Sequence, residues 1–224
     1  KVLVLTVSER DIPADIRADV MDTGRRDLNF DDTTKLIGVI NGLSKQLRGD
    51  DGMTWQVDPR MMRRAVAFCA KIGDTDQPGT SKNVAATLPE ISRRFNADLT
   101  LEQKEHTANI TARHIDGSMN LQQRNELMQW LKEDAADPRE CRVLCNVRCL
   151  SEGVDVPALD SVIFLSSRNS QVDVVQSVGR VMRTFRRGQP DEKKYGYIII
   201  PIVVPEDVKP EDALNDDRYF AVVW

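Results

Sequence analysis

The strongest constraint on the fold of this chain is a regular alternation of short apolar segments with longer amphipathic ones. Apolar segments typical of buried strands occur at residues 1–7, 64–69, 109–115, 141–146, 161–165 and 195–202. Amphipathic segments with helical spacing occur at residues 31–47, 81–95, 119–133 and 172–182, whereas residues 8–32 and 48–60 are expected to be mainly irregular. Strands that alternate with helices form right-handed β–α–β units. The sequence therefore predicts an α/β fold in which helices flank a mostly parallel sheet.

The bulk composition is that of a soluble domain. The 224 residues suit one α/β domain with a short appendage. With 41% hydrophobic residues, the core is expected to be stable without disulfide bonds or structural metal ions. The net charge of -4 argues against a protein that coats nucleic acid with its whole surface. A local basic groove is compatible with that charge, because phosphate contacts need only a few well-placed Arg or Lys.

Neither end of the chain carries a membrane or export signal. No apolar run reaches the roughly 20 residues of a transmembrane helix, and residues 1–6 are too short for a signal peptide. We therefore expect a cytoplasmic location and no membrane partner. The chain begins without Met, and residues 218–224 start an amphipathic helix that stops with the chain. We expect both ends to lie inside a longer protein.

Four cysteines are present, and the last three are spaced by four residues: Cys69, Cys141, Cys145 and Cys149. On a helix this spacing would place three thiols on one face and suggest a metal site. However, residues 142–146 have the pattern of a buried strand, and there is no C-x-x-C pair. We interpret the cysteines as buried thiols in a reducing compartment and predict no metal site.

One helical segment carries four residues on a single face, at offsets of 3, 4 and 7: Gln176, Gly179, Arg180 and Arg183. Paired guanidinium groups suit phosphate because each presents a fixed fork of donors, and a glycine lets a ligand approach closely. Taken alone, the segment could equally be a solvated basic helix end, since Arg186 and Arg187 continue its charge.

A second segment, Ser-Glu-Gly-Val-Asp-Val-Pro at residues 151–157, follows one of the predicted strands. Gly153 permits a tight backbone path, and Asp155 places a carboxylate in the loop. Taken alone, this could be an ordinary connection that uses Gly and Pro as turn residues. Because all these segments follow a strand or open a helix, we expect them to gather at the carboxyl edge of the sheet.

In their order and spacing, the two segments resemble motifs V and VI of superfamily 2 helicases, in the forms EGVDVP and QxxGRxxR. Residues 64–69 resemble motif IV, and residues 114–124 (HIDGSMNLQQR) are similar to the "HGxxxxxxR" segment of that group. The resemblance covers residues 60–203. It implies the second RecA-like domain of a helicase motor, with a P-loop NTPase-like fold that lacks its own Walker A loop.

The resemblance also implies roles at the nucleotide. Arg180 and Arg183 would reach the γ-phosphate of ATP as arginine fingers, and Gln176 would contact the nucleotide or the attacking water. The residues implied in binding and coupling the nucleotide are Gly153, Asp155 and Gly179.

Loops after the strands would face nucleic acid, through the residues Lys71, Gly117, Ser118, Asn146 and Arg148. Backbone N–H groups and hydroxyls hold phosphates without reading sequence. Ordinary turn chemistry accounts for these residues nearly as well. DEAD-box proteins carry a motif V Thr that touches the phosphate backbone, and Val147 stands at the aligned position, which favours DNA over RNA.

The chain lacks the other half of an ATP site. No GxxxxGK[ST] loop is present, and no predicted strand ends in a DExx sequence. We therefore expect ATP and Mg²⁺ to be held mainly by an N-terminal RecA-like domain of the same polypeptide. This chain alone is not expected to hydrolyse ATP, whereas the full-length protein is expected to be an ATP-dependent helicase.

Residues 31–43 and 217–224 look like those of large bacterial "predicted helicases" akin to single-polypeptide restriction–modification enzymes. In that family a nuclease domain precedes the motor, and some members carry a methyltransferase after it. We divide the chain into a first strand, acidic loop and packing helix (1–60), a RecA-like core (61–204) and the start of a helical segment (205–224). The alternative function is a non-catalytic nucleic-acid- or protein-binding module with the same fold. An unrelated α/β nucleotide-binding domain would need a glycine-rich phosphate loop.

Overall fold

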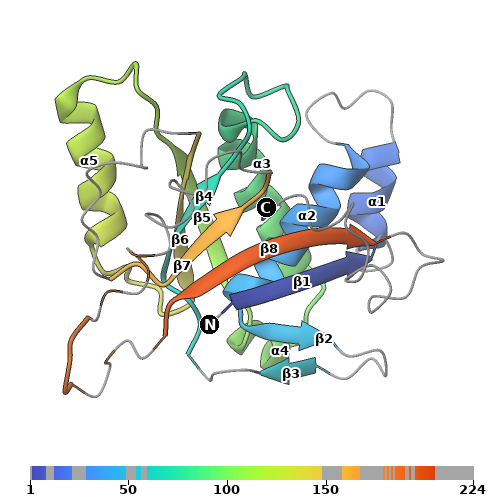
Figure 1. The fold of residues 1–224 in the computed structure, drawn as a ribbon. Helices are drawn as coiled ribbons and strands as arrows, with labels where there is room; N and C mark the ends of the chain where they lie inside the picture. The colour runs from blue at the N-terminus through green and yellow to red at the C-terminus, as the bar shows by residue number, and fades with distance from the viewer. Residues whose placement is uncertain are drawn as a thin grey trace.

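The computed structural model shows a parallel sheet with helices on both faces (Figure 1). It describes residues 2–8, 13–21, 29–48, 54–56, 60–147, 158–166, 179, 181, 183, 185–189, 192 and 195–204, and for 2–8, 46–48 and 54–56 the backbone only. The predictions at Cys149 and at residues 205–224 lie outside these residues.

Within the described residues, six strands form the main sheet: β1 (Val2–Ser8), β4 (Arg64–Phe68), β5 (Asn109–His114), β6 (Glu140–Asn146), β7 (Ser161–Phe164) and β8 (Tyr197–Val204). Their order is β1-β8-β7-β4-β6-β5, and all neighbouring pairs are parallel. The predicted parallel α/β fold is therefore confirmed. All carboxyl ends of the strands lie at one end of the sheet, and all amino ends lie at the other.

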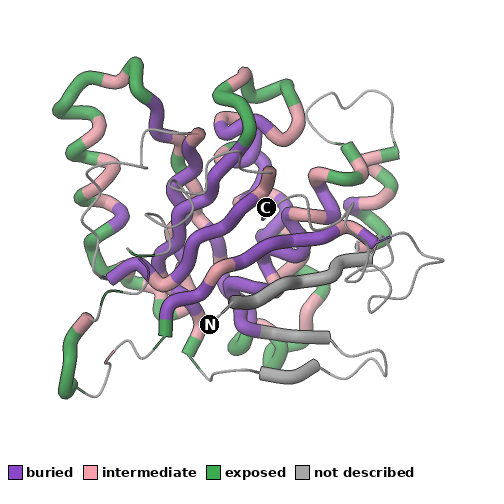
Figure 2. The backbone as a smooth tube through the Cα atoms, in the orientation of Figure 1, coloured by how far each residue is buried: buried purple, intermediate pink, exposed green. Residues whose placement is uncertain are grey.

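Alternate side chains of the strands pack on opposite faces, as strand geometry requires. The helices that are described along their whole length are α1 (Ala14–Met21), α2 (Phe30–Leu43), α3 (Ser81–Ala97), α4 (Leu101–Glu105) and α5 (Leu121–Lys132). In β4, Ala65 and Ala67 pack in one core cluster with α1, α2 and α3. Val66 and Phe68 pack in a second cluster with α5, where the Phe68 ring stacks on Phe164 at 5.6 Å. The central strands are therefore buried on both faces (Figure 2).

Four short elements were not predicted. Helix α1 lies in the stretch expected to be irregular, where burial of Ile16 against the sheet cluster stabilises it. Strands β2 (Gln46–Arg48) and β3 (Thr54–Gln56) form an antiparallel pair. The segment predicted to be helical to residue 47 ends as a helix at Leu43, so β2 begins inside it, whereas β3 lies in the expected loop. Helix α4 is a single turn with a capping box at Thr100, a contribution too local for the apolar pattern to show.

The cysteine interpretation agrees with the structure at the three described positions. Cys69, Cys141 and Cys145 are buried and not disulfide-bonded, and burial raises the pKa of the Cys141 and Cys145 thiols. Among the described residues there is no cluster of His, Cys, Asp and Glu that could hold a metal ion. The helices in the described part of the chain are all too short or too polar to cross a membrane.

Candidate functional site

The loop after β4 is fixed to the start of α3 by backbone hydrogen bonds. The Ser81 N–H donates to the Lys71 carbonyl at 2.9 Å, and the Lys82 N–H donates to the Ile72 carbonyl at 3.3 Å. The Thr80 hydroxyl accepts from the Asn83 N–H at 3.4 Å. The first amides of this helix are thus used within the chain, so the loop offers a ligand the exposed Lys71 side chain rather than a row of amides.

The turn after β5 is organised around the Asp116 carboxylate. One oxygen, Oδ1, accepts from the Ser118 N–H at 2.8 Å and from the Ser118 hydroxyl at 2.5 Å. The other, Oδ2, lies 2.8 Å from Nε2 of His114. These bonds, from Ser118 first and then from His114, hold the pKa of Asp116 well below its usual range. Asp116 is therefore an ionised acceptor at neutral pH.

His114 extends this arrangement to α3. Because the Asp116 carboxylate can only accept, Nε2 of His114 carries the proton that faces it. Nδ1, on the other side of the ring, lies 3.0 Å from the Ser81 hydroxyl, with which it forms a hydrogen bond. We call Ser81, His114, Asp116 and Ser118 the edge network. It joins the loops that follow two strands at the carboxyl end of the sheet.

The edge network changes what two predicted nucleic-acid residues can do. Both donors of Ser118 are taken by Asp116, so Ser118 has no hydrogen left for a phosphate in this conformation. Gly117 is exposed, no hydrogen bond occupies its N–H within the described residues, and a Cβ added there would meet nothing within 4 Å. Of the two, Gly117 is the residue that a ligand can approach.

Asn146 does not face solvent, which corrects its prediction as a nucleic-acid contact. The residue is fully buried, and its Nδ2 donates to the Ala67 carbonyl at 3.1 Å. Its backbone carbonyl accepts from the Cys69 N–H at 2.8 Å. Asn146 therefore ties β6 to β4, although its Oδ1 has no hydrogen-bond partner among the described residues. The predictions at Gly153, Asp155, Arg148, Gln176 and Arg180 lie outside the described residues.

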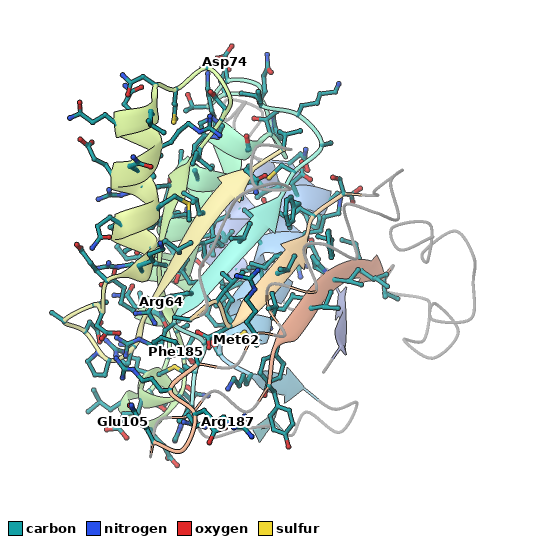
Figure 3. All side chains as sticks on the ribbon, turned by 60° about the vertical axis from the view of Figure 1, so that its left-hand side comes forward. Met62, Arg64, Asp74, Glu105, Phe185 and Arg187 are labelled. Atoms are coloured by element: carbon teal, nitrogen blue, oxygen red, sulfur yellow. The ribbon has the colours of Figure 1, made fainter. Side chains whose placement is uncertain are left out.

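We call residues 176–189 the arginine segment. Its described residues from Val181 onward lie at the end of the sheet where the strands begin. Val181 is buried, and a Cβ on Gly196, just before β8, would lie 2.4 Å from it. Arg186 donates to Asp134, which also accepts from Arg64 at the start of β4. Figure 3 shows Arg64, Phe185 and Arg187 far from Asp74 in the loop after β4. We predicted that all candidate segments gather at the carboxyl edge of the sheet. For the end of the arginine segment, around Arg186, this prediction is wrong.

Within the arginine segment, two candidate residues are described. Gly179 is helical and exposed, and a Cβ added there would meet nothing within 4 Å. Arg183 is also exposed. An exposed guanidinium can donate to the oxygens of a triphosphate, which only accept, and an exposed glycine leaves room for such a ligand.

The end of the arginine segment is anchored through Asp134 to a buried arginine that the sequence did not single out. Arg64 donates to the carbonyls of Leu131 and Lys132 at the end of α5, at 2.9 and 3.0 Å. It also donates to Asp134 Oδ1 at 2.6 Å, while Arg186 reaches Oδ2 at 3.2 Å. The bond from Arg64, more than the one from Arg186, lowers the pKa of Asp134. No local pattern indicates this contact, because Asp134 lies 70 residues from Arg64 and 52 residues from Arg186.

Comparison with known proteins shows which protein family this chain resembles. Residues 81–185 match the family described as helicase conserved C-terminal domain. The matched range begins at α3 and includes β5, β6, β7 and the edge network. Together with the all-parallel sheet, this match supports the predicted RecA-like helicase C-terminal domain.

Two particular proteins are similar to the chain. The ATP-dependent Type ISP restriction–modification enzyme LlaBIII, solved bound to DNA, is 36% identical with a TM-score of 0.77 and covers 100% of this chain. Putative helicase 22 of Sulfolobus islandicus filamentous virus (isolate Iceland/Hveragerdi) is 25% identical over 130 residues, 54% of this chain. The chain spans 13% of the LlaBIII chain and 22% of the viral protein.

Proposed function

We propose that this chain is the second motor domain of an ATP-dependent DNA helicase or translocase. The observation that carries the proposal is that Gly179 and Arg183, four residues apart, are both exposed within a range that matches the helicase C-terminal family. The chain supplies arginines and part of the DNA track, and an upstream RecA-like domain of the same polypeptide completes the ATP site.

In this proposal Arg180 and Arg183 donate to the γ-phosphate of an ATP held by the upstream domain. Gln176 orients the nucleotide or the attacking water, and Gly153 and Asp155 link the nucleotide to the DNA track. ATP with Mg²⁺ supplies the phosphoryl group whose transfer releases free energy. The arginines stabilise the charge that develops there, a role worth about 10³–10⁵ in rate.

Candidate residues are exposed at both ends of the sheet, which supports a motor that binds DNA and nucleotide on separate surfaces. Lys71 and Gly117 are exposed at the carboxyl end of the sheet, whereas Arg183 lies in a segment anchored at the amino end. We propose that the carboxyl end, with Arg148, contacts the phosphate backbone of DNA. DNA is favoured over RNA because LlaBIII is described as bound to DNA.

The same similarity supports a wider context for the full-length protein. LlaBIII is described as a restriction–modification enzyme. We propose that the full-length protein belongs to a bacterial cytoplasmic system of that kind and carries nuclease or methyltransferase domains outside this chain.

The alternative is a binding module that keeps the fold without a motor. A domain of this kind would bind DNA or protein but would not need its arginines for turnover. The two functions therefore differ in the effect of an arginine substitution on ATP hydrolysis.

The test joins this chain to the sequence that precedes it in its gene and measures ATP hydrolysis with and without duplex DNA. Arg180→Ala and Arg183→Ala should each reduce DNA-stimulated turnover by about 10³-fold or more. Arg187→Ala is the matched control, because Arg187 is exposed and has no hydrogen bond or ion pair within the described residues. Turnover near wild type in both arginine variants would show that the motor assignment is wrong.

A further inference from the structure

Two members of the edge network are buried, and the exposed Ser118 has both of its donors occupied, so these side chains are poorly placed to contact a ligand themselves. Ser81 is fully buried and Asp116 is 6% exposed. The carboxylate is also negative, so a direct contact with a phosphate would be repulsive. Its three hydrogen bonds instead hold the chain on either side of the turn. The network therefore positions the residue that the turn exposes to solvent.

The turn presents Gly117. Its φ lies outside the left-handed region, and a Cβ added to it would have no atom within 4 Å, so the fold itself does not require glycine here. In contrast, Gly79 has φ +73 and would place a Cβ 2.7 Å from Asp32. A glycine that neither backbone nor packing requires suits a surface that another molecule approaches closely.

We propose that Asp116 is a positioning residue for the DNA track. By holding Ser118 directly and Ser81 through His114, it fixes the Gly117 amide and the start of α3 as one surface facing the phosphate backbone. This inference rests on the proposed function, because it assumes that the carboxyl end of the sheet contacts DNA.

The hydrogen-bond geometry predicts which substitutions the network tolerates. In Asp116→Asn, Oδ1 still accepts from Ser118. The new Nδ2 can donate to Nε2 of His114 if the ring proton moves to Nδ1, which then donates to the Ser81 hydroxyl. Asp116→Ala loses every one of these bonds. A positioning role therefore predicts rescue by Asn, whereas a role for the negative charge itself does not.

The chain offers a matched control at the opposite end of the sheet. The Asp137 Oδ1 accepts from the N–H of Arg139, two residues on, at 2.8 Å, as Asp116 does from Ser118. Asp137 lies between α5 and β6, before the start of a strand. Asp137→Ala removes the same kind of turn bond without touching the edge network.

The experiment measures binding of this chain to a fluorescein-labelled DNA duplex of about 25 base pairs at low salt by fluorescence anisotropy. Asp116→Ala should raise Kd about tenfold, Asp116→Asn less than about threefold, and Asp137→Ala should leave Kd unchanged. Thermal unfolding of each variant separates weaker binding from a smaller folded fraction. If Asp116→Ala does not fold, Ser118→Ala, at an exposed position, should still raise Kd about two- to threefold.

The outcomes distinguish the inference from the function on which it rests. Wild-type affinity in Asp116→Ala or, if that variant does not fold, in Ser118→Ala overturns the positioning role alone. Equal weakening in Asp116→Ala and Asp137→Ala also overturns it, because the effect would then be general destabilisation. If the wild-type chain itself does not bind the duplex, both the DNA track and the positioning role are wrong.

Discussion

Replacing Gly179 with Ala should stabilise this chain and impair the motor. Gly179 is helical and exposed, and an added Cβ meets nothing within 4 Å. Glycine in a helix costs about 0.5–1 kcal/mol relative to alanine, so Gly179→Ala should gain about that much. For a domain of this size, the gain raises Tm by about 1–4 °C. Nothing among the described residues explains why a glycine is kept at this position.

Our explanation is that the nucleotide or the upstream domain approaches this position closely. Gly179→Ala should then lower DNA-stimulated ATP turnover of the longer polypeptide by about 10–100-fold, since small misplacements at a reacting centre have effects of this size. Gly196→Ala is the comparison, because its Cβ would lie 2.4 Å from Val181 and should lower Tm. Thermal unfolding and steady-state ATPase assays check both variants. A Gly179→Ala protein that is more stable and fully active would refute the close-approach reasoning.

Three further substitutions test the fold around the two ends of the sheet. Arg64→Met should cost about 2–4 kcal/mol in urea unfolding, because two carbonyls at the end of α5 lose their donor; a cost below about 1 kcal/mol would contradict this. Gly79→Ala should cost at least about 1–2 kcal/mol from its left-handed backbone alone, and an unchanged Tm would show that the loop relaxes. Asp116 has a lowered pKa, so its contribution is complete above its unfolded value and is lost as pH falls below about 4. The Tm difference between wild type and Asp116→Asn should therefore become smaller as the pH is lowered from 7 to 3. A Tm difference that does not change with pH would show that the charge of the Asp116 carboxylate does not cause it.

Much of the fold was predictable because its signals are local. The spacing of buried residues in β4, β6 and β8 and the apolar stripes of α3 and α5 follow from strand and helix periods. Elements with short or weak periods were missed, such as α1, which depends on the burial of Ile16 by the rest of the fold.

The site was less predictable because it depends on contacts between distant residues. Ser81 and His114 are 33 residues apart, although the Asp-Gly-Ser sequence at 116–118 did indicate a turn. Asn146 was misplaced because a residue at a strand end can face either the loop or the neighbouring strand.

The central claim is that the arginines of this chain complete an ATP site on another domain. The most direct test is the ATP turnover number of the longer polypeptide at saturating DNA, compared between wild type and Arg183→Ala. Our account predicts a loss of about 10³-fold or more in the turnover of the folded variant, with thermal unfolding used to confirm that the variant is folded. Equal turnover in the two proteins would contradict it and would leave a DNA- or protein-binding module as the better description.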